Sequence, residues 1–453
     1  MALKALRIGA GAGYAGDRIP PAVALAEKGQ LDYLVFECLA ERTIALAQLE
    51  KIQNPMRGFD PLLSARMKAV LPACMAHGTR IITNMGAANP LQAGKEVLAV
   101  AKALGLHQLK VAVVLGDDVL AILQTQYLSE PLMDSTHTVS DIQALLVSAN
   151  AYLGAEALLP ALQSDAHVII SGRVADPALF LAPLMHHFQW RADDWPLLGK
   201  GVMVGHLLEC AAQITGGYFA DPGYKDVPNL AQLGYPLAEV SANGNVVITK
   251  LADAGGCVTV QTCTEQLLYE IEDPTQYMQP DVVADFSQVQ LEQVGVDRVL
   301  AVGASGTTRP DTLKVTLGYR DGFVGEGQMS YAGPGAKDRG QLALDVVKAR
   351  LADAGYGHFE ARYDLIGVNA ILGDTQPSYE PAEVRARIAV RVNTQAQALY
   401  VANEVEALYT NGPASGGGAS KSVREVIAAA SMLMPRSAIQ TQTVLLQGSE
   451  ELA

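Results

Sequence analysis

Side chains capable of acid–base chemistry are concentrated between His167 and Pro228, and no other segment of the chain is as rich in them. This stretch offers Arg173, Asp176, His206, Glu209, Tyr218, Asp221, Tyr224, Lys225 and Asp226. An enzyme site needs such a mixture of carboxylates, bases and hydrogen-bond donors to move protons and to hold a polar substrate.

His206 and Glu209 stand three residues apart in the sequence GHLLECAAQ. On a helix this spacing places both side chains on one face, with Gln213 a turn further along. The pair could be a general base with its partner, two metal ligands, or a buried histidine bonded to its own helix neighbour. Because the chain has no H-E-x-x-H motif and no third histidine nearby, we expect no catalytic metal.

Arg173 and Asp176 follow the apolar run from His167 to Ile170, which predicts a buried strand. At the end of a parallel strand, these side chains could clamp a carboxylate or phosphate and orient a base. The alternative is a salt bridge that pins the turn, with Asp176-Pro177 starting the next helix.

Asn84 and Asn89 lie in the sequence TNMGAANP, where Asn84 could donate to a substrate carbonyl group. Asn89 precedes a proline as an N-cap residue would, which favours a structural role for it. The expected catalytic residues are therefore His206, Glu209, Arg173, Asp176 and Asn84. The expected substrate-binding residues are Asn89, Tyr218, Tyr224 and Lys225.

A glycine-rich segment, NGPASGGGASKS, precedes the run VREVIAAASML, for which we expect a helix. Glycines before a helix leave its first N–H groups open to an anion, and nearby basic residues add positive charge. The expected phosphate-binding residues are Ser415, Gly416, Gly417, Gly418, Lys421 and Arg424. The spacing is not that of a Walker A loop, and a flexible linker is the alternative.

Gly11, Gly13 and Gly16 match the G-x-G-x-x-G pattern after a first strand, and Glu37 ends the second strand. This arrangement would suit a dinucleotide. However, Pro20 and Pro21 postpone the helix that should receive the pyrophosphate, so a plain tight turn is the alternative.

Short apolar runs alternate with helical patterns through the first half of the chain. The runs are ALRIGA, DYLVFE, RIITNM, KVAVVLG, HVIISG and, as a further candidate, VMVGH. Buried strands separated by helices predict an α/β domain at residues 1–235, with a mostly parallel sheet and flanking helices. Polar turns after these strands would share one edge of the sheet and form a cleft.

Antiparallel signals follow, and they predict an α+β domain at residues 236–453. Asn243-Gly244 separates two extended runs, as in a β-hairpin, and the segment around Arg320-Asp321-Gly322 repeats the theme. We expect helices at about 336–354 and 395–409, with the strand EVRARIAVRV between them.

Composition and charge narrow the class of protein. Hydrophobic residues make up 49% of the chain and charged residues 18%, as in well-packed globular proteins. The net charge of −14 argues against nucleic acid or an anionic membrane as the partner. Five cysteines without a C-x-x-C pair indicate reduced thiols, and no apolar run is long enough for a membrane span. We expect a cytoplasmic protein with a small-molecule substrate, forming a homo-oligomer, most simply a dimer.

The chain resembles the acyclic terpene utilisation family, AtuA type, over nearly its whole length. The segments that carry the resemblance include IGAGAGYAGDRIPPA, LDYLVFECLAERTIALAQ, TNMGAANP, SGRVADPALFLAPL, GHLLECAAQITGGYFADPGYKDVP, TLKVTLGYRDGFVGEGQMSYAGPGA and NGPASGGG. The resemblance implies the short form, because some relatives carry an extra small C-terminal domain. It also implies a role in bacterial breakdown of citronellol and geraniol, which proceeds through CoA thioesters of branched acids.

These observations favour an enzyme of branched acyl-CoA or carboxylic acid catabolism, a lyase or hydratase that uses acid–base chemistry without a redox cofactor. CoA would enter as part of the substrate. Two alternatives stay open: a nucleotide-dependent oxidoreductase built on Gly11, Gly13 and Gly16, and a non-catalytic protein that binds or assembles acyl-CoA enzymes of the same pathway.

Overall fold

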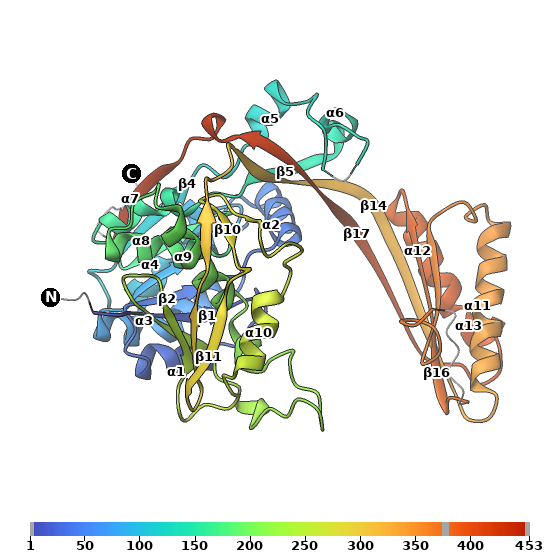
Figure 1. The fold of residues 1–453 in the computed structure, drawn as a ribbon. Helices are drawn as coiled ribbons and strands as arrows, with labels where there is room; N and C mark the ends of the chain where they lie inside the picture. Colours follow the sequence, from blue (N-terminus) through green and yellow to red (C-terminus); the bar gives the residue numbers. More distant parts are fainter. Residues whose placement is uncertain (1–3, 134, 374–379, 449–453) are drawn as a thin grey trace. The chain divides into compact units, whose positions relative to one another are not determined.

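The computed structural model describes residues 4–133, 135–373 and 380–448 (Figure 1). The chain forms two compact units. The first comprises residues up to Gly318 and from Ala429 onward, and the second comprises Tyr319–Ala428. This division differs from the expected domains, 1–235 and 236–453, because the strands that follow Pro236 continue the sheet of the first unit.

Within the described residues, the first unit contains a ten-stranded mixed sheet in the order β11-β12-β8-β7-β1-β2-β3-β6-β4-β18. Its parallel centre consists of β1 (Leu6–Ala12), β2 (Tyr33–Phe36), β3 (Arg80–Thr83), β6 (Val168–Ser171) and β4 (Lys110–Leu115). The antiparallel strands are β7 (Pro236–Val240), β8 (Val246–Lys250), β11 (Gln290–Gly295), β12 (Arg298–Val302) and β18 (Gln442–Gln447). The predicted α/β class and the hairpin at Asn243-Gly244 are confirmed.

Helices connect the parallel strands in two series. The first series is α1 (Pro20–Lys28), α2 (Glu41–Gln53), α3 (Leu63–His77) and α4 (Pro90–Ala103). The second is α5 (Leu120–Gln126), α6 (Val139–Ile142), α7 (Leu159–Gln163), α8 (Ala178–Phe188) and α9 (Trp195–Glu209). None of the helices in the described part of the chain is both long and apolar enough to span a lipid bilayer.

The direction of the connections reverses between β3 and β6. The chain advances along the sheet through β1, β2 and β3 to β4, and then returns to β6 and onward to β7. The helices that follow β3 and β6 belong to separate groups, because α4 packs on α3, which packs on α1, whereas α8 packs with α7 and α9. The carboxyl ends of β3 and β6 flank the crevice where open α/β sheets place their ligands.

The segment VMVGH is helical, so its prediction as a further strand is wrong. It lies in α9, whose residues from Leu198 onward are almost all buried. One side of α9 faces the main sheet, and the other faces the small sheet of β9 (Tyr277–Met278), β10 (Val283–Asp285) and β13 (Ser305–Thr307). A helix buried on all sides loses the amphipathic period that would distinguish it from a strand.

The second unit is an antiparallel sheet covered by helices. Its strand order is β15 (Ala361–Ile366), β16 (Glu383–Val392), β14 (Thr312–Ala332) and β17 (Gly417–Pro435). The start of β14 and the end of β17 belong to the first unit, which also contains β5 (Leu146–Ala151), a further partner of β14. The helices are α11 (Ala336–Asp353), α12 (Gln395–Glu406) and α13 (Leu408–Asn411), and α10 (Val260–Leu268) belongs to the first unit. The helices predicted at about 336–354 and 395–409 and the strand EVRARIAVRV are confirmed.

Two local predictions in this part of the chain are wrong. The expected hairpin at Arg320-Asp321-Gly322 is instead the middle of the single long strand β14, where Gly322 adopts a φ of 75° without reversing the chain. The expected helix after the glycine-rich segment is strand β17, which pairs with β14. A long partner strand satisfied the backbone donors and acceptors in both places, and tertiary pairing overrode the local preference.

Gly13 allows the turn after β1 to lie against the end of α9. A Cβ atom on Gly13 would come within 2.4 Å of the carbonyl oxygen of Glu209, a fixed backbone atom. The turn is closed by the Gly13 amide, which donates to Asp17 over 2.8 Å. Pro20 and Pro21 occupy the start of α1, so Gly16 lies outside this helix. Close packing of backbone segments accounts for Gly13 without a nucleotide.

Gly13→Ala should therefore destabilise the protein by about 1–3 kcal/mol, the usual range for overpacking a rigid site. Gly16→Ala is the matched control, because the three atoms nearest to its Cβ all belong to the side chain of Tyr14, which is 67% exposed and can move aside. Thermal unfolding of both variants would test the difference. Equal melting temperatures would contradict the packing role of Gly13.

Candidate active site

Four strands deliver buried polar side chains to the same edge of the central sheet. Glu37 follows β2, Asn84 follows β3, Asp117 follows β4 and Arg173 follows β6. Each of them is at most 8% exposed. The carboxyl ends of parallel strands meet at one edge, which explains why residues from distant parts of the sequence come together here.

Arg173 lies at the centre of this group. Its guanidinium group donates to the carbonyl oxygen of Leu39, pairs with Asp176 over 3.1 Å and stacks on the ring of Tyr152 at 4.0 Å from the centroid. The Tyr152 hydroxyl in turn donates to Glu41, which also pairs with Lys314 over 3.3 Å. The structure thus brings together Arg173 and Asp176, as the sequence predicted, and adds Tyr152 and Glu41.

Asn84 positions Glu37. Its amide nitrogen donates to Glu37 over 2.9 Å, and its amide oxygen accepts from the Cys38 backbone over 2.8 Å. Glu37 also accepts from the Leu39 amide over 2.9 Å. Since Asn84 is fully buried and both ends of its amide are bound to protein, it acts here on Glu37 and is not presented to a substrate carbonyl group.

The carboxyl groups around Arg173 have different pKa values. Burial raises the pKa of Glu37 well above its ordinary value, and the charge of Asp176 adds to this. Burial also raises the pKa of Asp176 to about 7, although Arg173 acts in the opposite direction. Burial opposes ionisation of Glu41 too, but there the hydrogen bond from Tyr152 and the charge of Arg173 prevail and lower the pKa to about 2. Carboxyl groups whose pKa values are pushed apart in this way are typical of acid–base sites.

Asp176 and Glu41 are the accessible carboxyl groups, with 34% and 40% of their side chains exposed, whereas the Arg173 side chain is only 2% exposed. Two polar atoms in this region are buried and lack a partner: Arg173 Nε and Glu209 Oε2. Buried polar atoms are normally satisfied, and exceptions occur at functional sites. Asp176 Oδ1 is also buried, and its partner is the Arg173 guanidinium group.

His206 and Glu209 share a face of α9, as predicted, and form a buried pair. His206 Nδ1 lies 3.0 Å from Glu209 Oε1, and Nε2 lies 3.2 Å from the Leu267 carbonyl oxygen. A carbonyl oxygen only accepts, so Nε2 carries a proton, and Nδ1 and Glu209 share a second one. Burial raises the pKa of Glu209, while its bond to His206 acts against this. Both ring nitrogens of His206 are therefore engaged by protein atoms.

Strained backbone gathers at the loops around this edge. Ala87, Ala211, Tyr218 and Glu270 have φ values of 45°, 40°, 59° and 57°. Left-handed backbone costs a non-glycine residue on the order of 1–2 kcal/mol and tends to cluster at functional sites. Glu270 is exposed, and its charge raises the pKa values of both Asp176 and Glu209. Among these residues, Glu270 is near enough to Asp176 and Glu209 for its charge to affect their ionisation.

The expected substrate-binding residues separate into different environments. Tyr218 is 91% exposed. Burial raises the pKa of Tyr269, the residue before Glu270, and Tyr218 adds to this shift. Lys225 pairs with Glu265 of α10 and lies 5.0 Å from the ring centre of Phe219, and Tyr224 is 88% exposed. Asn89 donates to two backbone carbonyl oxygens, those of Pro55 and Arg57, over 2.8 Å each, which is a structural role.

The expected phosphate-binding residues, Ser415 to Arg424, lie in the second unit. The helix that should have directed its N–H groups at an anion is absent there, because the segment forms β17. Lys421 is neutralised by Glu406 over 2.5 Å and bound to Asn403 over 3.0 Å. The described residues contain no cluster of three or more histidine, cysteine, aspartate or glutamate side chains arranged to hold a metal ion.

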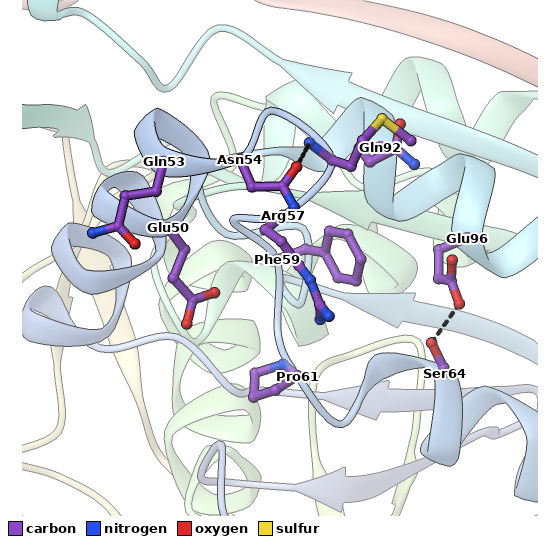
Figure 2. Close-up of a pocket in the computed structure, with 10 residues that line it drawn as sticks. Glu50, Gln53, Asn54, Arg57, Phe59, Pro61, Ser64, Gln92 and Glu96 are labelled. Atoms are coloured by element: carbon purple, nitrogen blue, oxygen red, sulfur yellow. Dashed lines mark hydrogen bonds between the residues drawn. The ribbon is translucent and has the colours of Figure 1, made fainter.

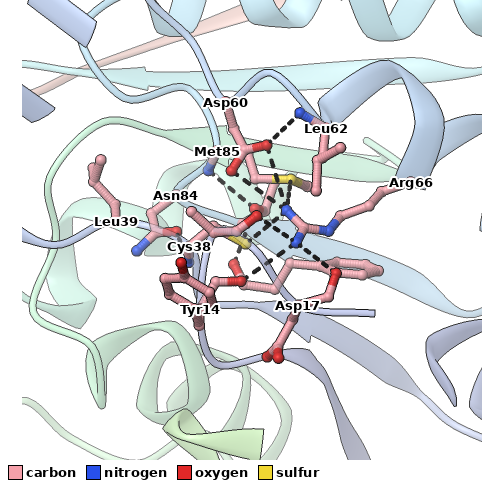
Figure 3. A network of polar contacts seen from close by, with 12 residues as sticks. Tyr14, Asp17, Cys38, Leu39, Asp60, Leu62, Arg66, Asn84 and Met85 are labelled. Atoms are coloured by element: carbon pink, nitrogen blue, oxygen red, sulfur yellow. Dashed lines mark hydrogen bonds and ion pairs between the residues drawn. The ribbon is translucent and has the colours of Figure 1, made fainter. Parts of the chain in front are cut away.

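Arg66, which the sequence patterns did not single out, holds the loops beneath the site (Figure 3). This fully buried guanidinium group lies 3.3 Å from Asp60 and contacts the sulfur atoms of Cys38 and Met85. It also donates to the carbonyl oxygens of Tyr14, Ala15 and Asp17. One side chain on α3 thereby ties together the segments that follow β1, β2 and β3. An arginine inside an amphipathic helix gives no sequence signal of this role.

A separate hollow of about 460 Å³ lies among α2, the loop after it and α4 (Figure 2). Its walls include Glu50, Asn54, Arg57, Phe59 and Glu96, and Ser64 donates to Glu96 over 2.7 Å. None of the residues predicted from sequence lines it. Most of its walls are exposed, and the strained loops and unsatisfied atoms described above lie elsewhere.

The fold and site together define an α/β protein with an arginine-centred group of carboxyl groups at the carboxyl edge of its sheet. The chain belongs to the acyclic terpene utilisation family: the model of the "Acyclic terpene utilisation family protein AtuA" matches residues 6–445. Membership places the protein in the utilisation of acyclic terpenes and confirms the resemblance seen in the sequence. No curated protein and no solved structure matches the chain.

Arg66→Met should destabilise the protein by about 3–5 kcal/mol, because it leaves the Asp60 carboxylate buried without its partner. The double variant Arg66→Met/Asp60→Asn should recover part of this loss, since it removes the unpaired charge. Urea unfolding of the two variants and of Asp60→Asn alone would measure the coupling. Additive effects of the two substitutions would contradict it.

Asp117 should make stability depend on pH. Burial raises its pKa from 3.8 to about 6, so the folded protein binds this proton more tightly than the unfolded chain does. The resulting stabilisation is complete below the unfolded pKa and is lost as the pH rises through about 6. Asp117→Asn can still accept from the Arg173 amide and from Asn150, and it cannot ionise. The variant should be more stable than the parent by on the order of 2–3 kcal/mol at about pH 8, and equal to it near pH 4, in urea unfolding.

Proposed function

We propose that this protein is an acid–base enzyme of acyclic terpene breakdown, a lyase or hydratase acting on a branched carboxylic acid or its CoA thioester. The observation that carries the proposal is Asp176, an accessible carboxyl group whose pKa is raised to about 7 beside a buried arginine. A general base works best when its pKa lies near the operating pH. Family membership supplies the pathway, the utilisation of acyclic terpenes, and so supports a substrate from that pathway.

Asp176 is the residue that takes the proton. Its partner Arg173 holds it in place and keeps a positive charge within 3.1 Å of the reacting carboxylate. That charge would stabilise the negative charge that develops on a substrate carbonyl or carboxyl group. The pKa of Glu41 is lowered to about 2, so this carboxylate can balance the charge of Arg173, whereas burial disfavours ionisation of Glu37 by raising its pKa.

In this proposal His206 and Glu209 have a structural role and do not act as the general base. Sequence reasoning made His206 the general base, but both of its ring nitrogens contact protein atoms in a buried pocket. A histidine in this state must break an existing bond before it can accept a substrate proton. The pair instead fixes the end of α9, where the unsatisfied Glu209 Oε2 lies in the region of Asp176.

The substrate can be found by thermal shift, because a ligand that binds only the folded protein raises its melting temperature. The panel is CoA, branched acyl-CoA thioesters, the corresponding free acids and NAD. Stabilisation by the thioesters or the acids supports the proposal, and turnover is then followed with the stabilising compound. Stabilisation by NAD alone would contradict it.

Asp176→Asn should lower kcat by about 100-fold or more, the usual effect of losing a general base. In the parent enzyme kcat/KM should rise with pH and level off above about 7, because Asp176 must be ionised to accept a proton. His206→Gln is the matched control, since it alters a neighbouring buried group and should retain most of the turnover. A folded His206→Gln variant without turnover, together with an active Asp176→Asn variant, would overturn the assignment.

A further inference from the structure

Strand β16 carries three arginines, Arg385, Arg387 and Arg391, on the face of the sheet opposite the helices. The alternate residues from Val384 to Val392 are buried against α11 and α12, so the odd-numbered positions project from the other face. These arginines share a strand and a face, but they differ in whether their hydrogen-bond partners are acidic or neutral.

Two of the three are neutralised by carboxylates. Arg387 pairs with Glu326 over 2.6 Å and with Asp364 over 2.8 Å. Arg391 pairs with Asp321 and, over 3.7 Å, with Glu360. Each therefore has two acidic partners, as expected for arginines whose role is to hold the strands together.

Arg385 is bound by neutral oxygen atoms alone in the part of the chain that the structure describes. It donates to the side chain of Gln328, to Ser330 over 2.7 Å, to the Gly418 carbonyl oxygen over 3.0 Å and to Ser420 over 2.8 Å. Four of its five N–H donors are used in this way, which fixes the guanidinium group and leaves one N–H and the full positive charge.

A cavity of about 540 Å³ lies at this arginine. Its walls include Arg385, Ser330, Ser415, Gly417 and Glu383. The Ser330 hydroxyl accepts from Arg385, so its own proton is available to a ligand. The cavity has the volume usual for small-molecule sites. Ser415 and Gly417 belong to the glycine-rich segment that sequence reasoning marked for phosphate.

We infer that this cavity binds an anionic group, a phosphate or a carboxylate, through Arg385 and Ser330. Anion recognition here comes from a fixed, uncompensated guanidinium group and from hydroxyls on neighbouring strands, in place of the helix N-terminus expected from the sequence. A partly buried charge without a counterion is costly to keep, and an anionic ligand would supply that counterion. Glu383 faces the same cavity and limits the affinity for a bare dianion.

The test uses the full chain and three probes: inorganic phosphate, CoA and acetate. Isothermal titration calorimetry should show saturable binding of at least one of them. Preference for phosphate and CoA identifies the group as a phosphate, and preference for acetate identifies it as a carboxylate. Absence of binding by all three at millimolar concentration overturns the inference.

Variants separate Arg385 from its neighbours. Arg385→Gln should weaken binding at least tenfold, because it removes a charge-assisted hydrogen bond. Arg387→Gln, on the same strand but already neutralised, should leave the affinity within about twofold. Glu383 forms no ion pair within the described residues, so Glu383→Gln should tighten binding severalfold, which keeps the test decisive if Arg385→Gln fails to fold. Equal affinities of the parent and Glu383→Gln proteins, or of Arg385→Gln and the parent, would contradict the site.

Discussion

The buried positive charge of Arg173 is the interaction on which the candidate active site depends. A guanidinium group 2% exposed must be compensated, and the chain does so with a backbone carbonyl group, a stacked tyrosine ring and the carboxylate of Asp176. The same charge lowers the pKa of the carboxyl groups around it, and burial opposes this to different degrees. The pKa of Glu41 falls to about 2, burial raises that of Asp176 to about 7, and burial raises that of Glu37 well above its ordinary value.

The topology of the sheet explains why these groups meet. The connections from β3 and β6 run in opposite directions along the sheet, and ligands of open α/β sheets lie at such a reversal. The loops at this edge would be loosely held on their own. Arg66 binds the loops that follow three of the strands. Elsewhere two backbone segments pack directly on each other, as Gly13 does on the backbone of Glu209.

Partners, and not residue types, distinguish the roles of similar side chains in this protein. Arg66 and Arg387 have structural roles because carboxylates of the protein pair with their guanidinium groups. Arg385 has the same chemistry on the same strand as Arg387 but lacks an acidic partner within the described residues. His206 likewise has the chemistry of a base, yet its ring nitrogens are already occupied.

The sequence by itself determined the α/β class, the five parallel strands, the family and the concentration of chemistry around Arg173 and Asp176, because apolar runs and strand-end motifs are local signals. Only the tertiary structure decided which of those residues face one another. Pairing with a distant strand produced β17 in place of the expected helix after Gly418, and burial of α9 on both sides removed the amphipathic period that would have identified VMVGH as helical. Burial and partners also set the pKa values that favour Asp176 over His206, and these depend on residues far away in sequence, such as Glu41 and Tyr152.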